Sequence, residues 1–147
     1  MPNGVYNRVK FLLATGAINL TTADTRVMLV NATYAFNDDH NFLDNAGATD
    51  PIDHEISVGG YARQALATKV VVEDDTNNFA YFDADDTIFT ALVAGQTVGG
   101  AIVYRFNAAD TAAEVLGFYD LVDTATNGGN ITIQWPTPAN GGVLRLA

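Results

Sequence analysis

The sequence predicts a mainly β protein: a single-domain antiparallel β-sandwich or barrel with one short N-terminal helix. Apolar or alternating segments recur along most of the chain, about eight or nine in number, with turn signals every 8–12 residues or so, the pattern of a sandwich or barrel. Asp, Asn, Thr and Gly are abundant, whereas the residues that usually fill helix surfaces are scarce. The chain of 147 residues has the size of one domain, and no linker or repeat divides residues 1–147.

The N-terminal segment predicts the only substantial helix, at about residues 3–14. Its apolar residues from Val5 to Leu13 recur at helical spacing and so share one face. Asn3 is the expected N-cap, and Gly16 is the expected stop.

Strands are expected from about residue 25 onward. β-branched or aromatic residues, often in strict alternation, predict each strand, and Gly, Pro, Asn and Asp fill the turns between them. The expected strands are residues 25–30, 55–58, 68–72, 78–83, 87–90, 101–106, 115–121, 131–135 and 143–146. Residues 45–53 are expected to form an exposed, mobile loop, and Gly95, Gly99 and Gly100 to form a link between strands.

The charge balance excludes several classes of partner. The chain has 17 Asp and Glu against 7 Lys and Arg, a net charge of −10, and its basic residues are scattered singly. Binding to nucleic acid or to an anionic membrane surface needs clustered Lys and Arg, so neither partner is expected. No run of about 18 apolar residues predicts a membrane-spanning helix. Without cysteine, the chain can form no disulfide, thiolate zinc site or cysteine nucleophile.

The two histidines and two acidic clusters are the candidate metal-binding residues, but neither group has the spacing of a known metal-binding motif. His40 follows two aspartates and His54 lies between Asp53 and Glu55, but no metal-binding histidine motif is present. The acidic clusters at 73–75 and 83–86 suggest calcium, yet they lack the calcium-loop pattern, and Asp is a preferred turn residue. We therefore predict no metal and no cofactor.

No catalytic constellation stands out. The acidic residues fall in predicted turns, and the single serine, Ser57, has flanking residues unlike a nucleophile elbow. Neither glycine pair has the lysine and helix that a phosphate-binding loop needs. We therefore expect a protein that is not an enzyme and has no catalytic residues.

Several segments, taken in order, resemble a group of small structural proteins encoded in the head and tail regions of tailed bacteriophages. The segments that carry the resemblance are residues 3–7, 26–30, 38–44, 59–64, 73–77, 82–86 and 124–129, followed by Trp135. They are turn and strand signatures, and no catalytic residue is carried over from the group.

The resemblance implies a virion component, a decoration (cement) protein on the outer surface of the capsid, synthesised in the host cytoplasm. The implied partners are the major capsid protein and copies of the chain itself, with a trimer as the favoured homo-oligomer. Two alternatives stay open: a tail or neck subunit, and a β-sandwich module that binds carbohydrate or calcium through its loops.

Five aromatic residues are the candidate protein-interface residues. The N-terminal helix and residues 31–53 carry more aromatic side chains than a short helix and loops usually need. These candidates are Tyr6, Phe11, Tyr34, Phe36 and Phe42. The alternative, which we weigh equally, is that the same side chains fill the ends of the core.

Overall fold

The structure, a computed structural model that describes residues 3–146, consists mainly of antiparallel β-strands, as the sequence predicts. The largest sheet has the strand order β1 (Gly4–Val5), β8 (Glu114–Ala125), β7 (Thr97–Arg105), β2 (Thr25–Asn31) and β3 (Gln64–Ala65). A three-stranded sheet has the order β10 (Leu144–Leu146), β5 (Phe79–Asp83) and β4 (Val70–Asp74). A two-stranded sheet pairs β6 (Thr87–Phe89) with β9 (Ile131–Ile133).

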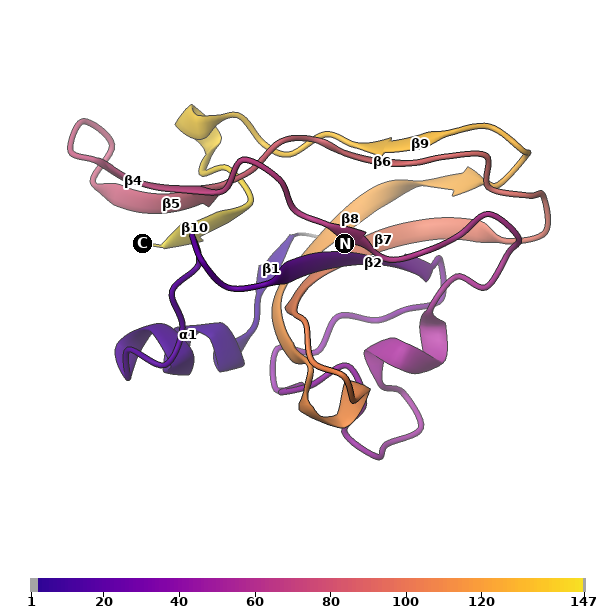
Figure 1. Cartoon of the computed structure of the whole chain (residues 1–147), viewed down its shortest axis with the longest axis horizontal. Helices are drawn as coiled ribbons and strands as arrows, with labels where there is room; N and C mark the ends of the chain where they lie inside the picture. The colour runs from indigo at the N-terminus through magenta and orange to yellow at the C-terminus, as the bar shows by residue number, and fades with distance from the viewer. Residues whose placement is uncertain (1–2, 147) are drawn as a thin grey trace.

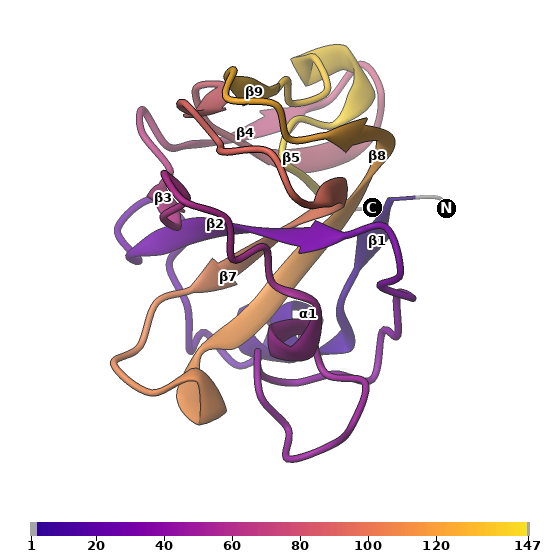
Figure 2. The ribbon, with the colours of Figure 1, turned by 90° about the vertical axis from the view of Figure 1, so that its right-hand side faces the viewer.

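The sheets form a sandwich in which both faces of the five-stranded sheet are covered. The two small sheets lie over one face (Figures 1 and 2). Residues 32–63 connect β2 to β3, and their first part, up to Ile52, covers the other face, whereas Ile56, Val58 and Tyr61 pack into the core on the side of the small sheets. We call residues 32–63 the covering segment; it contains the short 3₁₀ helix η1 (Pro51–His54). Two further 3₁₀ turns, η2 (Asp110–Ala112) and η3 (Pro138–Asn140), lie in connections outside the covering segment.

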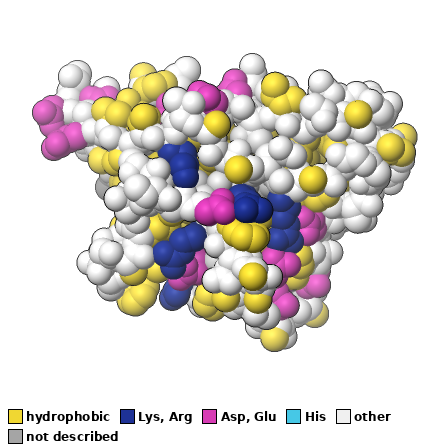
Figure 3. Space-filling model, viewed as in Figure 1, with side chains coloured by type: hydrophobic (Ala, Val, Ile, Leu, Met, Phe, Trp, Pro, Cys, Tyr) yellow, Lys and Arg dark blue, Asp and Glu magenta, His cyan; other side chains and the backbone are white. Residues whose placement is uncertain are grey.

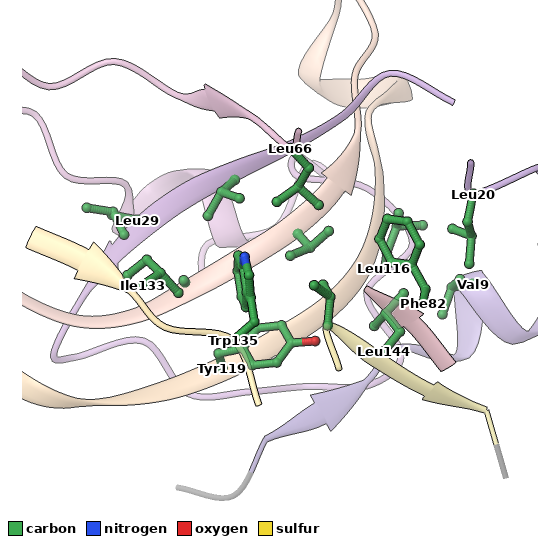
Figure 4. Close-up of a cluster of buried hydrophobic side chains, with 14 of the residues drawn as sticks. Val9, Leu20, Leu29, Leu66, Phe82, Leu116, Tyr119, Ile133, Trp135 and Leu144 are labelled. Carbon is green, nitrogen blue, oxygen red and sulfur yellow. The ribbon is translucent and has the colours of Figure 1, made fainter. Parts of the chain in front are cut away.

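The larger core lies between the five-stranded sheet and the small sheets. Leu29, Leu116 and Tyr119 from the large sheet belong to one cluster with Phe82 and Trp135 (Figure 4). Tyr119 and Trp135 meet edge to face, with ring centroids 4.8 Å apart. The indole N–H of Trp135 donates to the Asp85 carbonyl at 3.0 Å, so this polar group is satisfied inside the apolar layer.

The smaller core lies between the opposite face of the same sheet and the covering segment. Alternate residues such as Met28 and Ile102 point to this face and pack with Tyr34 and Leu43 of the covering segment. Because both faces are apolar, consecutive residues of β7 are buried from Val98 to Tyr104.

The helix begins later than the sequence predicts. It is α1 (Asn7–Ala14), and its N-cap is Tyr6 instead of Asn3. Gly4 and Val5 pair with Phe118 and Gly117 as strand β1, so these residues cannot also form the first helical turn. The helix packs Val9 and Leu12 into the larger core.

Two glycines that were expected in a link lie inside strand β7. A Cβ on Gly99 would lie 2.5 Å from the Cα of Ala32, and one on Gly100 would lie 2.5 Å from the Phe118 ring. Glycine is therefore needed here for close approach within the sheet and not for a turn. Strand β7 therefore begins at Thr97, earlier than the start predicted from the sequence at residue 101.

Two further predictions for the covering segment need correction. Of the expected strand at residues 55–58, only Glu55 makes a bridge, to Val30 of β2. The expected exposed loop at 45–53 is exposed at residues 45–49 and at Asp53, whereas Asp50 and Pro51 between them are buried. The Asp50 carboxylate accepts hydrogen bonds from the backbone N–H groups of Asn45 and Gly47, at 2.8 and 2.7 Å, and these bonds fix the loop.

Candidate interaction surfaces

Two of the five predicted interface residues, Phe11 of helix α1 and Phe42, lie beside the same arginine. The Arg8 guanidinium lies 5.4 Å from the centroid of the Phe11 ring and 5.2 Å from that of Phe42. Phe11 is 56% exposed, and Phe42 is half-buried. Glu114 holds the same guanidinium by accepting from its Nε at 3.0 Å and its Nη2 at 2.5 Å. We call Arg8, Phe11 and Phe42 the helix patch, a fixed cation between two aromatic rings.

The other three predicted residues pack into the smaller core. Tyr6 and Tyr34 are buried, with their hydroxyl oxygens 2.7 Å apart, and burial raises the pKa of Tyr6. The Phe36 ring is half-buried and stacks on Phe118 at a centroid distance of 5.5 Å. Tyr6 and Tyr34 therefore lie in the core of this fold, where they help to seal the second face of the sheet, in agreement with the alternative that these side chains fill the core.

Strand β4 is a second surface, which the sequence analysis did not single out. Val70, Val71 and Val72 are 43%, 46% and 38% exposed although they are consecutive residues that point to alternate faces. Lys69 precedes them and Glu73 follows. We call residues 69–73 the valine edge. Its sequence signal was a run of three valines between opposite charges, but strand order, which places the run at a sheet edge, cannot be read from the sequence.

The end of the β4–β5 hairpin is acidic. Glu73, Asp74 and Asp75 lie there, and acidic side chains cluster at the corresponding end of the molecule in Figure 3. Beside the valine edge, Val71 lines an apolar hollow of about 310 Å³ together with Leu13 of α1 and Leu146 of β10. The apolar surface of the edge thus continues toward the helix.

A third apolar surface belongs to the far end of the sandwich. Val122 of β8 is 89% exposed, and Ile88 of β6 and Val93 are each about half exposed. The space-filling view shows apolar side chains at this end also (Figure 3). No sequence signal marked Val122, which directly follows the strand predicted at 115–121.

The two histidines have separate partners. His40 Nε2 lies 3.7 Å from a carboxylate oxygen of Asp50, and burial lowers the pKa of His40 despite that carboxylate. His54 Nδ1 lies 3.2 Å from the Thr33 hydroxyl, and its ring packs edge-on against Tyr34. Within residues 3–146, no three His, Asp or Glu side chains are grouped as ligands for a metal ion.

The acidic clusters have turn and capping contacts. Asp74 accepts from the backbone N–H groups of Thr76 and Asn77, and hydrogen bonds from Asn77 and these amides lower its pKa. Asp86 accepts from the backbone N–H of Trp135 at 3.0 Å, which ties the start of β6 to the end of β9. The local contacts of Asp74 agree with its interpretation as a turn residue, whereas Asp86 holds two distant segments together.

Comparison of the chain with protein-family models, with curated proteins and with solved structures found no match. In the part of the chain that the structure describes, no helix has both the length and the apolar character needed to cross a bilayer.

Proposed function

We propose that this chain is a non-enzymatic virion structural protein, a decoration protein that stabilises the head of a tailed bacteriophage through protein–protein contacts. One observation carries the proposal: apart from Phe106, the large exposed apolar side chains lie on three separate parts of the body. These are the helix patch, the valine edge and the end that includes Val122. A subunit of a surface lattice has to contact neighbours on several sides, whereas a binding module needs one such surface.

The charge of the chain suits the same role. A net charge of −10 keeps the free protein soluble before it binds, and local apolar and aromatic patches then supply the energy of association. The helix patch is the best candidate for contact with the capsid, because an exposed aromatic ring beside a held arginine has the composition of an interface hot spot. The resemblance of the sequence to phage head and tail proteins supports the assignment to a virion.

The test is to look for the chain in purified particles and to measure what it does there. Mass spectrometry should detect it in intact virions, and cryo-electron microscopy should locate it on the outer surface of the head. Heads that lack it should assemble normally and rupture at lower temperature or under milder osmotic shock. Heads that are equally robust, or that fail to assemble, would contradict the role of a decoration protein; density in the tail would assign it there instead.

A pair of variants tests the helix patch. Phe11→Ala should lower the occupancy of purified heads by about tenfold or more, as loss of a hot-spot residue does. Phe106→Ala is the matched control, because Phe106 is also exposed and also carries an arginine on its ring, with Arg26 3.5 Å from the centroid. Equal binding by both variants would exclude the helix patch as the capsid contact.

A further inference from the structure

The outer side of strand β4 is an unprotected sheet edge. Strand β4 is the last strand of its sheet and pairs with β5 alone, from Val70 opposite Asp83 to Asp74 opposite Phe79. Among residues 3–146, no backbone hydrogen bond joins the strand to any segment except β5. Natural sheet edges are usually blunted by a bulge, a proline or a central charge. The valine edge has a regular register and three central valines.

The sequence of the edge is self-complementary when two copies run antiparallel. A twofold axis normal to the sheet at Val71 places Val71 opposite its own copy and Val70 opposite Val72. The same axis places Lys69 of each copy opposite Glu73 of the other copy, so two such charge pairs form. Opposed residues in such a pair have Cβ atoms about 4.5–5.5 Å apart, so each lysine can reach the facing carboxylate.

The neighbouring registers bring together less compatible side chains across the twofold axis. An axis at Val72 sets Val71 against Glu73 and Val70 against Asp74, which opposes apolar side chains to carboxylates. An axis at Glu73 sets that residue against its own copy, and an axis at Val70 sets Val71 against Lys69. Only the register centred on Val71 pairs like with like in the middle and opposite charges at both ends.

The side chains of the edge are free for this use. Glu73 is exposed, and no ion pair to it is found among residues 3–146. Lys69 donates to the Ala23 carbonyl, and its ammonium group carries three N–H donors, so two remain. The β4–β5 hairpin projects from the body (Figure 1), which leaves room for a second hairpin alongside.

We infer that the partner of the valine edge is a second copy of this chain, which joins antiparallel about Val71 to make one continuous six-stranded sheet across a twofold axis. The inference deepens the proposed function and rests on its premise that this surface binds protein. The twofold pair differs from the trimer implied by the family resemblance.

The first test measures the mass of the purified full-length chain by sedimentation equilibrium over a range of concentrations. The wild type should form dimers, and Glu73→Lys should raise the dissociation constant about tenfold or more, because it opposes lysine to lysine twice. Lys69→Glu should do the same by opposing glutamates. An equal mixture of the two variants should restore dimers, since every facing pair is then Lys with Glu.

The control for charge is Asp75→Lys. Like Glu73→Lys, it replaces a carboxylate with lysine, but Asp75 lies outside the residue pairs of the register centred on Val71. It should leave the dissociation constant within about threefold of the wild type. A dimer broken by Asp75→Lys and not by Glu73→Lys would overturn the register, because Asp75 faces Lys69 only when the axis lies at Val72. A wild type that stays monomeric at every concentration would overturn the inference altogether.

The second test uses the absence of cysteine from the sequence. Directly opposed residues of antiparallel strands have Cα atoms about 4.5–5.5 Å apart, within the range that a disulfide spans. Val71→Cys should therefore form covalent dimers under mild oxidation, and Val122→Cys, which is more exposed but remote, should not. Equal cross-linking of both variants would contradict the pairing. A dimer in solution with no protein in virions would refute the proposed function alone, and a monomer that still decorates heads would refute this inference alone.

Discussion

Replacing Glu114 with glutamine should destabilise the fold, because its carboxylate joins the helix to the large sheet. Glu114 is 5% exposed and begins β8. Its carboxylate accepts two hydrogen bonds from Arg8 of α1 and pairs with Arg105 of β7. One side chain therefore ties the helix to two central strands.

The size of the effect follows from these contacts. Hydrogen bonds to charged groups contribute about 1.5–3 kcal/mol each in favourable cases, and breaking a buried ion pair costs about 3–5 kcal/mol. Here the side chains of Arg8 and Arg105 stay 25% and 31% exposed, so water can solvate them after the carboxylate is lost. We therefore expect Glu114→Gln to lower the free energy of unfolding by about 2–3 kcal/mol, at the lower end of these ranges.

Urea denaturation followed by the fluorescence of Trp135, the only tryptophan, measures this change because the ring is buried in the larger core. The midpoint should fall by about 1 M and the melting temperature by about 5–10 °C. Asp75→Asn is the control: it also removes one charge, from an exposed turn, and should shift the free energy by less than about 0.5 kcal/mol. If both variants match the wild type, the idea that Glu114 joins helix and sheet is wrong.

Three further outcomes are expected. Burial raises the pKa of Tyr34 from 10.0 to about 12, so its contribution is complete below pH 10 and is lost as pH rises toward 12. Because burial also raises the pKa of Tyr6, Tyr61 and Tyr119, the fall in unfolding free energy from pH 10 to 12 should be about 2–3 kcal/mol larger in the wild type than in Tyr34→Phe, and equal falls would contradict the assignment. Tyr6→Phe removes one partner of the buried hydroxyl pair and should cost about 1 kcal/mol in chemical denaturation, whereas a gain in stability would show that the pair is not needed. Gly100→Ala places a methyl group 2.5 Å from the buried Phe118 ring and should lower the unfolding free energy by about 1–3 kcal/mol; Gly59→Ala, whose nearest neighbour is the exposed Val93 side chain, is the comparison, and equal effects would argue against crowding at Gly100.

The sequence predicted the fold class and most strands because the signals for both are local. The aromatic run of Phe79, Tyr81 and Phe82 favours a strand, and the turn at 74–77 has aspartate and asparagine where the backbone needs their hydrogen bonds. Helix length was overestimated because the pairing of Gly4 and Val5 with β8 joins residues more than a hundred positions apart. No local pattern reports such a contact.

The candidate surfaces were predicted less well for a related reason. Tyr6 and Tyr34 were candidates because loops rarely carry so many aromatic side chains, and the structure gives these two a core that the sequence did not reveal. Phe11 is exposed and Phe42 is half-buried, so their role at an interface stays a prediction; the arginine that they share was not foreseen. The valine edge depends on strand order, since the same three valines in a central strand would have been ordinary core residues.

The two-sided burial of β7 has a consequence for how this chain can evolve. A strand with one face in water accepts polar residues at every second position, so its sequence can drift while its shape is kept. In β7, residues 98–104 are all enclosed, and neighbouring positions are constrained by different sets of atoms above and below. Sequence variation among descendants of this chain should therefore spare a continuous block of seven positions and collect at the rim, where new binding partners could be acquired without disturbing the interior.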